Sequence, residues 1–309
     1  MAVKSITRFG IQRKIVANMT TESWQNIPHV SYQYTPDVTD FWSYFKKFSA
    51  ENTGSNGEKI TFNSVLLKAM AEAIEYHPVI NAHMRYEKGL VRGKVTVFDN
   101  IDISVPWALP NGEMMTITMK DMGNKTLKEI AEYQADINRR LKNTNLTEAL
   151  YSVSFNDTIE KLKKGHIIKV AQRLFGANTN KNHKIPLLKG EAKKAYEAIP
   201  ETDRITHKDL KQGTITISNV GADTRGLSGE IAMLMVIPPQ ICAIAIGSMQ
   251  KKPVVVTDEN GEDKIVIKTI LPINICFDHR ALDFADVRPF ISKLDEFFQN
   301  PELILNDKA

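Results

Sequence analysis

The chain has 309 residues, 42% of them hydrophobic and 25% charged, which is the composition of a globular protein with a sizeable core. Two cysteines are too few for a disulfide framework or a zinc site, and a net charge of +4 without interleaved aromatic residues gives no reason to expect nucleic-acid binding. Pro238 and Pro239 interrupt the longest apolar stretch and residues 1–19 carry no signal pattern, so we expect a cytoplasmic protein without a membrane span.

The first half of the chain predicts helices and strands that alternate. Apolar residues from Phe62 to Ile74 recur at helical spacing, which predicts a core-packing helix. A second such stripe runs from Leu127 to Leu141, behind a capping box that begins at Thr126. The segments 94–98 and 101–105 between them have the composition of strands. Mixed strands and helices indicate an α/β fold.

A basic stretch follows, at about residues 150–211, and resembles an insertion. Residues 160–211 contain 13 Lys or Arg and 6 Asp or Glu, a net charge of +7, whereas the rest of the chain has −3. Three interpretations remain open: a solvated surface subdomain, a dock for an acidic partner, or a site for the phosphates of a thiol such as coenzyme A. The first is favoured, because charge runs usually face water.

The segment 213–217 predicts a short strand that ends at Ser218-Asn219 and a turn containing Gly221. Ser218 is thereby placed where it can donate a hydrogen bond, although such a strand end is also common turn chemistry. Further along, the segments 253–257 and 264–269 flank Asn260-Gly261 and predict a hairpin.

The last elements place a histidine at the junction between a strand and a helix. The segment 270–277 has strand composition, and apolar residues from Val287 to Phe298 recur at helical spacing. His279 follows the strand directly, with Asp283 four residues later. A strand end exposes a side chain above a rigid backbone, as a proton-transferring group requires. The alternative is a histidine that only caps the helix.

These segments together resemble a known family, the catalytic domain of dihydrolipoamide acyltransferases, which are core components of 2-oxo acid dehydrogenase complexes. The resemblance covers nearly the whole chain outside the basic stretch. The motifs that carry it are Arg13-Lys14-Ile15-Val16-Ala17-Asn18-Met19, Ile27-Pro28-His29-Val30, Asp37-Val38-Thr39, His77-Pro78 with Asn81-Ala82, Thr216-Ile217-Ser218-Asn219-Val220-Gly221, Ile237-Pro238-Pro239-Gln240 leading into 242–247, and Asp278-His279-Arg280 with Asp283.

The resemblance implies an α/β fold of two layers, a mixed sheet covered by helices, as in coenzyme A-dependent acyltransferases of the chloramphenicol acetyltransferase type. It implies one catalytic domain over 1–309 that forms trimers, or larger multiples of trimers, with active sites between subunits. We expect neither a lipoyl domain nor a peripheral subunit-binding domain here. A lipoyl group would come from another chain, and lipoyl-bearing proteins and 2-oxo acid dehydrogenase components are the expected partners.

The same resemblance implies the roles of three residues. His279 would act as general base and Ser218 as oxyanion donor, with coenzyme A as a substrate and without a metal. Asp283 would fix the local structure by pairing with a cation, either Arg13 or Arg280, or with backbone groups.

Two departures from the family pattern leave alternatives open. Phe284 stands where the family has glycine, and Ile237 stands where it has asparagine. The chain could therefore be an acyltransferase acting on thiols, an O-acyltransferase resembling chloramphenicol acetyltransferase, or a non-catalytic trimeric scaffold. A hydrolase triad with Ser218 as nucleophile is disfavoured, because the Gly-x-Ser-x-Gly elbow is missing.

Overall fold

A computed structural model describes residues 2–52, 59–108, 114–163, 167–178, 184–222, 224–227 and 229–306. Contacts divide the chain into two compact units. The first contains residues 1–21 and 136–211, and the second contains residues 22–135 and 212–309. No helix in the described ranges is long and apolar enough to cross a lipid bilayer. The expectation of a single domain over the whole chain stays a prediction.

The second unit is built on a mixed six-stranded sheet with the order β1-β10-β7-β6-β4-β5. β10 pairs antiparallel with both β1 and β7, whereas β6 runs parallel to its neighbours β7 and β4. The strands of this sheet are β1 (His29–Tyr34), β4 (Ile103–Ala108), β5 (Met114–Met119), β6 (Ile215–Asn219), β7 (Cys242–Ile246) and β10 (Ile273–Asp278).

The two faces of this sheet differ in chemistry. Because side chains alternate along a strand, residues in register on neighbouring strands share a face. One face carries Ile275, Ile244 and Ile217, which are all fully buried. The other face carries small polar side chains, among them Asn274 and Ser218, on either side of Ala245 in β7. The apolar face forms the main core, while on the other face Ala243 and Cys276 join a smaller buried cluster beside these polar side chains.

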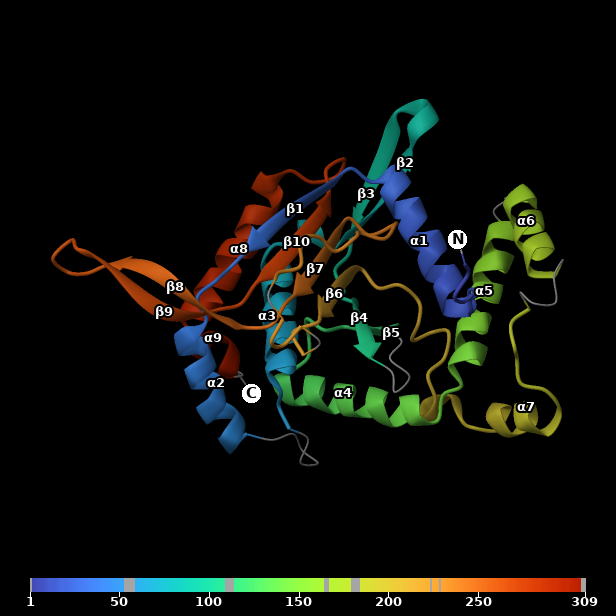
Figure 1. Cartoon of the computed structure of the whole chain (residues 1–309), viewed down its shortest axis with the longest axis horizontal. Helices are drawn as coiled ribbons and strands as arrows, with labels where there is room; N and C mark the ends of the chain where they lie inside the picture. The colour runs from blue at the N-terminus through green and yellow to red at the C-terminus, as the bar shows by residue number, and fades with distance from the viewer. Residues whose placement is uncertain are drawn as a thin grey trace. The chain divides into compact units, whose positions relative to one another are not determined.

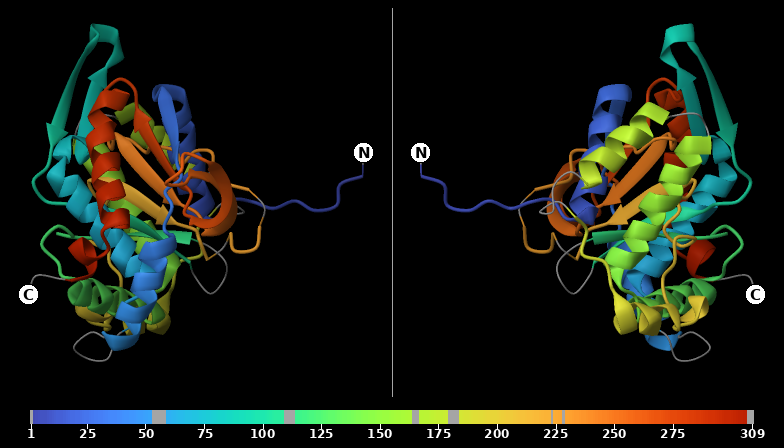
Figure 2. Two further views of the ribbon diagram at one scale, coloured as in Figure 1. Left: turned by 90° about the vertical axis from the view of Figure 1, so that its left-hand side faces the viewer. Right: turned by 90° about the vertical axis from the view of Figure 1, so that its right-hand side faces the viewer.

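Helices α2 (Thr39–Glu51), α3 (Phe62–Tyr76), α8 (Phe284–Gln299) and α9 (Glu302–Leu305) belong to the same unit. Figures 1 and 2 show α3 and α8 side by side on one face of the sheet. Phe290 of α8 and Met70 of α3 are fully buried, as the apolar stripes predict. The Thr61 hydroxyl accepts a hydrogen bond from the backbone N–H of Ser64 at 3.1 Å and thereby caps α3.

Two hairpins extend from this unit beyond the sheet (Figure 1). β2 (Ala82–Glu87) pairs with β3 (Arg92–Val97), and β8 (Gln250–Thr257) pairs with β9 (Asp263–Ile270). Gly261 takes a φ of +81° in the turn between β8 and β9, which explains the glycine of the expected hairpin. Val255 and Ile265, opposite each other on β8 and β9, are 61% and 76% exposed.

The first unit is helical. It contains α5 (Leu146–Lys163), α6 (Ile167–Asn178) and α7 (Gly190–Glu197), while the unit boundary falls within α1 (Ile11–Asn26) and α4 (Leu127–Lys142). Arg140 Nη2 donates to Asp209 Oδ2 at 2.7 Å. Burial raises the pKa of Asp209, but hydrogen bonds from Arg140 and Thr206 outweigh it, so that the pKa lies below its usual value. Residues 164–166 and 179–183 of the expected insertion lie outside the described residues.

The α/β architecture with a mixed sheet and covering helices is the one that we expected, and most expected elements are present. The helices predicted after Thr126 and over 62–74 are α4 and α3, and the hairpin around Gly261 is β8–β9. The strand expected over 94–98 begins two residues earlier, as β3. These elements show strong periodicity or turn chemistry, which explains why sequence alone identified them.

Candidate active site

His279 lies immediately beyond β10, in the short turn that leads into α8. All six residues of β10 are buried, and the strand ends at Asp278. The backbone N–H groups of Ala281 and Leu282 both donate to the Asp278 carbonyl, at 2.9 and 3.1 Å, and close the turn. The His279 side chain is 52% exposed. A rigid backbone thus presents an accessible imidazole, as the sequence predicts for this junction.

Hydrogen bonds select one tautomer of this imidazole. His279 Nδ1 lies 3.1 Å from the carbonyl oxygen of Leu282 and 3.3 Å from Oδ1 of Asp283. Both oxygens can only accept, so Nδ1 must carry the hydrogen, and in the neutral ring Nε2 keeps its lone pair. The backbone N–H of His279 also donates to the Pro28 carbonyl at 3.0 Å, which fixes the main chain beneath the ring. Nε2 is therefore the atom that can accept a proton.

A buried ion pair holds the residues on either side of this histidine. The Asp278 side chain is 1% exposed and accepts from Arg280 Nε at 2.9 Å and from Nη2 at 2.6 Å. The guanidinium lies over the ring of Tyr86 in β2, 5.3 Å from its centroid. The hydrogen bond with Asp278 is the largest cause that raises the pKa of Arg280 above its usual value.

This arrangement corrects one expectation from the sequence, in which Arg280 was a possible partner of Asp283. Arg280 instead folds back onto Asp278, two residues before it, because a planar guanidinium matches a carboxylate in a two-point contact. Arg13, the other cation considered, belongs to the first unit. Asp283 is 77% exposed at the start of α8, and its contact in this turn is with His279 Nδ1.

Ser218 occupies the expected position near the end of β6, on the polar face of the sheet. The residue is 6% exposed, and its Oγ forms no hydrogen bond with any residue that the structure describes. Asn219 instead donates from Nδ2 to Asn63 Oδ1 at 2.9 Å and accepts from the Gly221 N–H at 2.9 Å. A Cβ at Gly221 would lie 2.8 Å from the Gly247 carbonyl, so the turn requires glycine.

The sheet does not bring Ser218 and His279 together within one chain. Ser218 is in register with Ala245 of β7, and Ala245 is in register with Asn274 of β10. His279 lies five residues further along from Asn274, at the opposite end of the strands. Two strand spacings and five residues of rise correspond to a separation of roughly 19 Å between the two Cα atoms. A hydrogen-bonded relay between them is excluded in a single copy.

An extended segment, residues 231–236, crosses part of the polar face and is held there mainly by other residues' side chains. Asn274 Oδ1 accepts from the Leu234 N–H at 3.0 Å, and His29 Nε2 accepts from the Val236 N–H at 3.2 Å. Ser31 and Gln33 of β1 donate to the carbonyls of this segment. His29 is therefore a structural anchor, a role that its position after Pro28 did not reveal.

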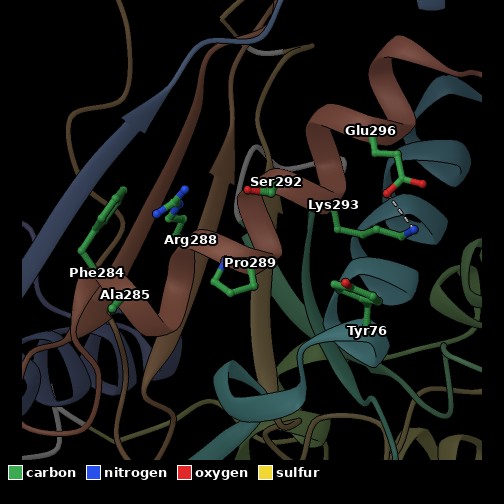
Figure 3. Close-up of a pocket in the computed structure, with 8 residues that line it drawn as sticks. All are labelled: Tyr76, Phe284, Ala285, Arg288, Pro289, Ser292, Lys293 and Glu296. Carbon is green, nitrogen blue, oxygen red and sulfur yellow. Dashed lines mark hydrogen bonds and ion pairs between the residues drawn. The ribbon is translucent and has the colours of Figure 1, made fainter.

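Phe284, which departs from the family pattern, leaves His279 accessible. It begins α8 without a positive φ and packs against Tyr32 of β1, with ring centroids 4.9 Å apart and the ring planes tilted by 53°. It also lines an open groove of about 860 Å³ along the outer side of α8 (Figure 3). Figure 3 shows Arg288 beside Phe284 in this groove and Lys293 paired with Glu296 further along α8.

The two cysteines lie in β7 and β10, away from solvent. Cys242 and Cys276 are free and buried. Burial raises the pKa of Cys276 to about 12, which keeps its thiol protonated. Among the described residues there is no group of three or more His, Cys, Asp or Glu that could hold a metal ion.

Comparisons with known proteins identify the family and the fold of the chain. A sequence model of the family "2-oxoacid dehydrogenases acyltransferase (catalytic domain)" matches residues 2–154 and 181–306. The unmatched segment, 155–180, lies inside the expected basic insertion. The dihydrolipoyllysine-residue acetyltransferase component of the pyruvate dehydrogenase complex of Staphylococcus epidermidis is 24% identical over 293 residues, which cover 95% of this chain and 51% of that protein. The corresponding component of Rickettsia prowazekii is 23% identical, with 95% and 53% covered.

The chain therefore spans about half the length of the curated relatives that it matches. Among solved structures, a probable dihydrolipoamide acetyltransferase from Listeria monocytogenes is 20% identical with a TM-score of 0.62, over 99% of this chain and 97% of that one. A truncated catalytic core of the 2-oxoacid dehydrogenase multienzyme complex from Thermoplasma acidophilum is 17% identical with a TM-score of 0.59, over 96% and 99%. These likenesses show that the chain has the fold of such catalytic cores.

Proposed function

The chain belongs to the family of 2-oxoacid dehydrogenase acyltransferase catalytic domains, and from this premise we propose that it moves an acyl group between coenzyme A and a thiol such as dihydrolipoamide. The observation that carries the proposal is the orientation of His279. With Nδ1–H bound to the Leu282 carbonyl, Nε2 is available as a base on an accessible ring.

The reaction can be written with the groups of this chain. Nε2 of His279 takes the proton of the acceptor thiol, and the resulting thiolate attacks the carbonyl carbon of the acyl thioester. Ser218 Oγ donates a hydrogen bond to the oxyanion of the tetrahedral intermediate. When the intermediate collapses, the leaving thiolate of coenzyme A receives the proton from the imidazolium. No acyl-enzyme forms, and the proton that was removed is returned.

The separation of the two residues requires that each site combine two copies of the chain. Because Ser218 and His279 lie at opposite ends of antiparallel strands, His279 of one copy would meet Ser218 of the next copy. Ser218 Oγ, without a partner among the described residues, is suited to such a role. The exposed Val255 and Ile265 of the β8–β9 hairpin also support assembly, since an isolated hairpin gains stability from apolar contacts. Because the chain belongs to the acyltransferase family whose members it resembles, we propose that the copies close into a trimer.

The lipoyl group and the other components of a 2-oxo acid dehydrogenase complex would come from partners. The chain covers about half the length of the curated relatives that it matches. That the lipoyl group lies on a separate chain or segment is therefore part of the proposal. Coenzyme A is treated as a substrate, and the segment 231–236 with the polar face beneath it is the surface available to substrates.

Mixing two inactive variants tests the proposal most directly. His279→Ala keeps the serine and Ser218→Ala keeps the histidine, so each trimer alone lacks one group at every site. When the two are co-expressed with different tags and the mixed trimers are isolated, a shared site forms wherever the intact groups meet. Each isolated mixed trimer then has one site of three with both intact groups, so it should show about one third of the wild-type acyl transfer from acetyl-coenzyme A to dihydrolipoamide.

The controls separate assembly from chemistry. Each variant alone must stay trimeric by light scattering and must have less than about 1% of wild-type activity. Mixed trimers that stay as inactive as their parents would contradict a site shared between copies. A wild-type trimer that binds neither coenzyme A nor dihydrolipoamide would contradict the acyltransferase proposal itself.

A further inference from the structure

The outer edge of β3 carries backbone groups that point away from the rest of the sheet. The Phe98 N–H donates to the Asn81 carbonyl at 3.0 Å, which identifies this pair as hydrogen-bonded. In antiparallel strands hydrogen-bonded and non-hydrogen-bonded pairs alternate, so Gly93, Val95 and Val97 belong to non-hydrogen-bonded pairs. Their N–H and C=O groups face outward.

These groups have no partner among the residues that the structure describes. β2 and β3 form a two-stranded sheet, in which β2 occupies one side of β3. The outer side of β2 is already used, because the Met84 N–H donates to the Pro239 carbonyl at 2.8 Å. Val95 and Val97 are 41% and 47% exposed, and Figures 1 and 2 show the tip of the hairpin projecting beyond α3 and α8 of the same unit. The free edge is a template for one more strand.

The two faces of the hairpin define which strand would fit. Tyr86 and Val95 share one face, which is apolar, with Met84 beside them. Arg85 and Lys94 lie opposite each other on the other face, which is basic. Residues 82–97 contain four Lys or Arg and one Glu, a net charge of +3. An added strand would therefore place apolar side chains on one face and acidic side chains on the other.

Charge also decides against a second copy of the same edge. In an antiparallel pair of two β3 strands centred on Gly93, Lys94 of one copy would lie opposite Arg92 of the other, and like charges in such positions destabilise pairing even though Arg92 also contacts Glu87. We propose that the outer edge of β3 binds an extended acidic segment of a partner protein by strand addition, with alternating acidic and apolar residues. Main-chain hydrogen bonds to Gly93, Val95 and Val97 would set the register of the added strand, and the cations of the hairpin would give the preference for acidic side chains.

Synthetic peptides test this proposal without an acyl-transfer assay, so it stands or fails separately from the proposed function. The probe is a blocked peptide of about eight residues that alternates Glu and Val, the length of an ordinary strand. One comparison peptide replaces Glu with Lys, and another keeps the composition but groups the Glu and Val residues in blocks. Binding to the full chain is followed by fluorescence anisotropy, and amide hydrogen exchange is followed by NMR.

We expect only the alternating acidic peptide to bind and to slow exchange at the amides of Gly93, Val95 and Val97, by about tenfold or more at saturation. The amide of Phe98, already bonded to Asn81, should change little. Equal binding of the acidic and basic peptides, or binding without protection of these three amides, would overturn the proposal. So would protection of the same amides by self-association in the absence of peptide.

Two variants test the main chain and the charge separately. Val95→Pro removes an outward N–H but no hydrogen bond to β2, and should weaken binding about tenfold, whereas Val95→Thr should not. Lys94→Glu should weaken the acidic peptide and strengthen its lysine counterpart. If Val95→Pro disrupts the hairpin, the peptide preference of Lys94→Glu still tests the proposal. Unchanged preference in Lys94→Glu would contradict the proposal.

Discussion

His279 is held by hydrogen bonds at its backbone N–H and at Nδ1, whereas the hydroxyl of Ser218, two strands away in the same sheet, has no partner among the described residues. The histidine turn uses the Leu282 carbonyl, the Pro28 carbonyl and the pair between Asp278 and Arg280. Around Ser218, the nearby hydrogen bonds belong to Asn219 and serve the turn.

The contrast reflects what each group must do in the proposed reaction. A base must present one nitrogen in one direction, and a ring that can rotate or change tautomer loses that ability. An oxyanion donor needs a hydroxyl that is not already engaged, because a donor committed elsewhere cannot stabilise a developing charge. In the proposed reaction, one end of the sheet therefore orients the imidazole of His279, and the other end keeps the hydroxyl of Ser218 available as a donor.

The strongest test of the comparison is removal of the imidazole. His279→Ala should lower kcat for acyl transfer by about 10³-fold, because no other base is oriented at this turn. The measurement is steady-state transfer from acetyl-coenzyme A to dihydrolipoamide, with folding checked by circular dichroism. A loss smaller than about tenfold would remove His279 from the role of base.

The buried pair beneath the histidine should affect stability. Arg280→Met leaves the Asp278 carboxylate, 1% exposed, without its cation and should lower the free energy of unfolding by about 3 kcal/mol. This value is at the low end of the usual range, since a quarter of the Arg280 side chain is exposed.

Urea denaturation measures this effect, with Arg288→Met as the matched control. Arg288 is an exposed arginine of α8 without an ion pair in the described part of the chain, so its replacement should change stability by less than about 0.5 kcal/mol. Equal effects of the two substitutions would contradict a structural role for the pair between Asp278 and Arg280.

The serine should matter for rate rather than for stability. Ser218→Ala should lower kcat by about 10²-fold with little change in the midpoint of unfolding, because the hydroxyl has no hydrogen-bond partner to lose among the described residues. Ser292→Ala, the same change on the outer side of α8, serves as the control and should leave kcat unchanged. A serine variant that unfolds at clearly lower urea would show that the hydroxyl is engaged in the folded chain.

Asp283 should contribute less to catalysis and to stability than its place in the motif suggests. Its carboxylate is 77% exposed, and the Leu282 carbonyl already holds the hydrogen on His279 Nδ1. Asp283→Asn should therefore reduce kcat by less than about tenfold and stability by less than about 1 kcal/mol. A loss as large as that of His279→Ala would assign the orientation of the ring to Asp283 instead of Leu282.

The smallest expected effect concerns the thiol next to this turn. Cys276 lies in β10, two residues before Asp278, and burial raises its pKa to about 12. A raised pKa means that roughly one thiol in 10⁴ is ionised at pH 8, so iodoacetamide should leave the mass and activity of the native protein unchanged. Rapid alkylation of Cys276 with loss of activity would show that the end of β10 opens in solution.

The sequence predicted the parts of this site that depend on local patterns. The strand before His279 and the helix after it follow from composition and periodicity over 270–298. Ser218 was placed correctly at a strand end for the same reason. The ion pair between Arg280 and Asp278 could not be predicted from the sequence. Asp278 and Asp283 are both close enough in the sequence to pair with Arg280, and only the path of the turn decides which of them does.

The long-range features could not be predicted either. The distance between Ser218 and His279 depends on the order β10-β7-β6 and on the direction of each strand, which no local pattern encodes. The anchoring role of His29 depends on a segment some 200 residues later in the chain, residues 231–236. The apolar composition of this segment gave no sign of an extended crossing of the polar face.

The way in which residues 231–236 are held has a consequence for how the protein can diversify. The side chains of Ser31, Gln33 and Asn274 bond to the backbone of this segment, so its path depends little on its own side chains. Met233 and Leu234 pack against the core, but exposed positions such as Ala232 can vary without altering the path. Natural or laboratory evolution could therefore reshape this surface for new acyl acceptors while the scaffold stays intact.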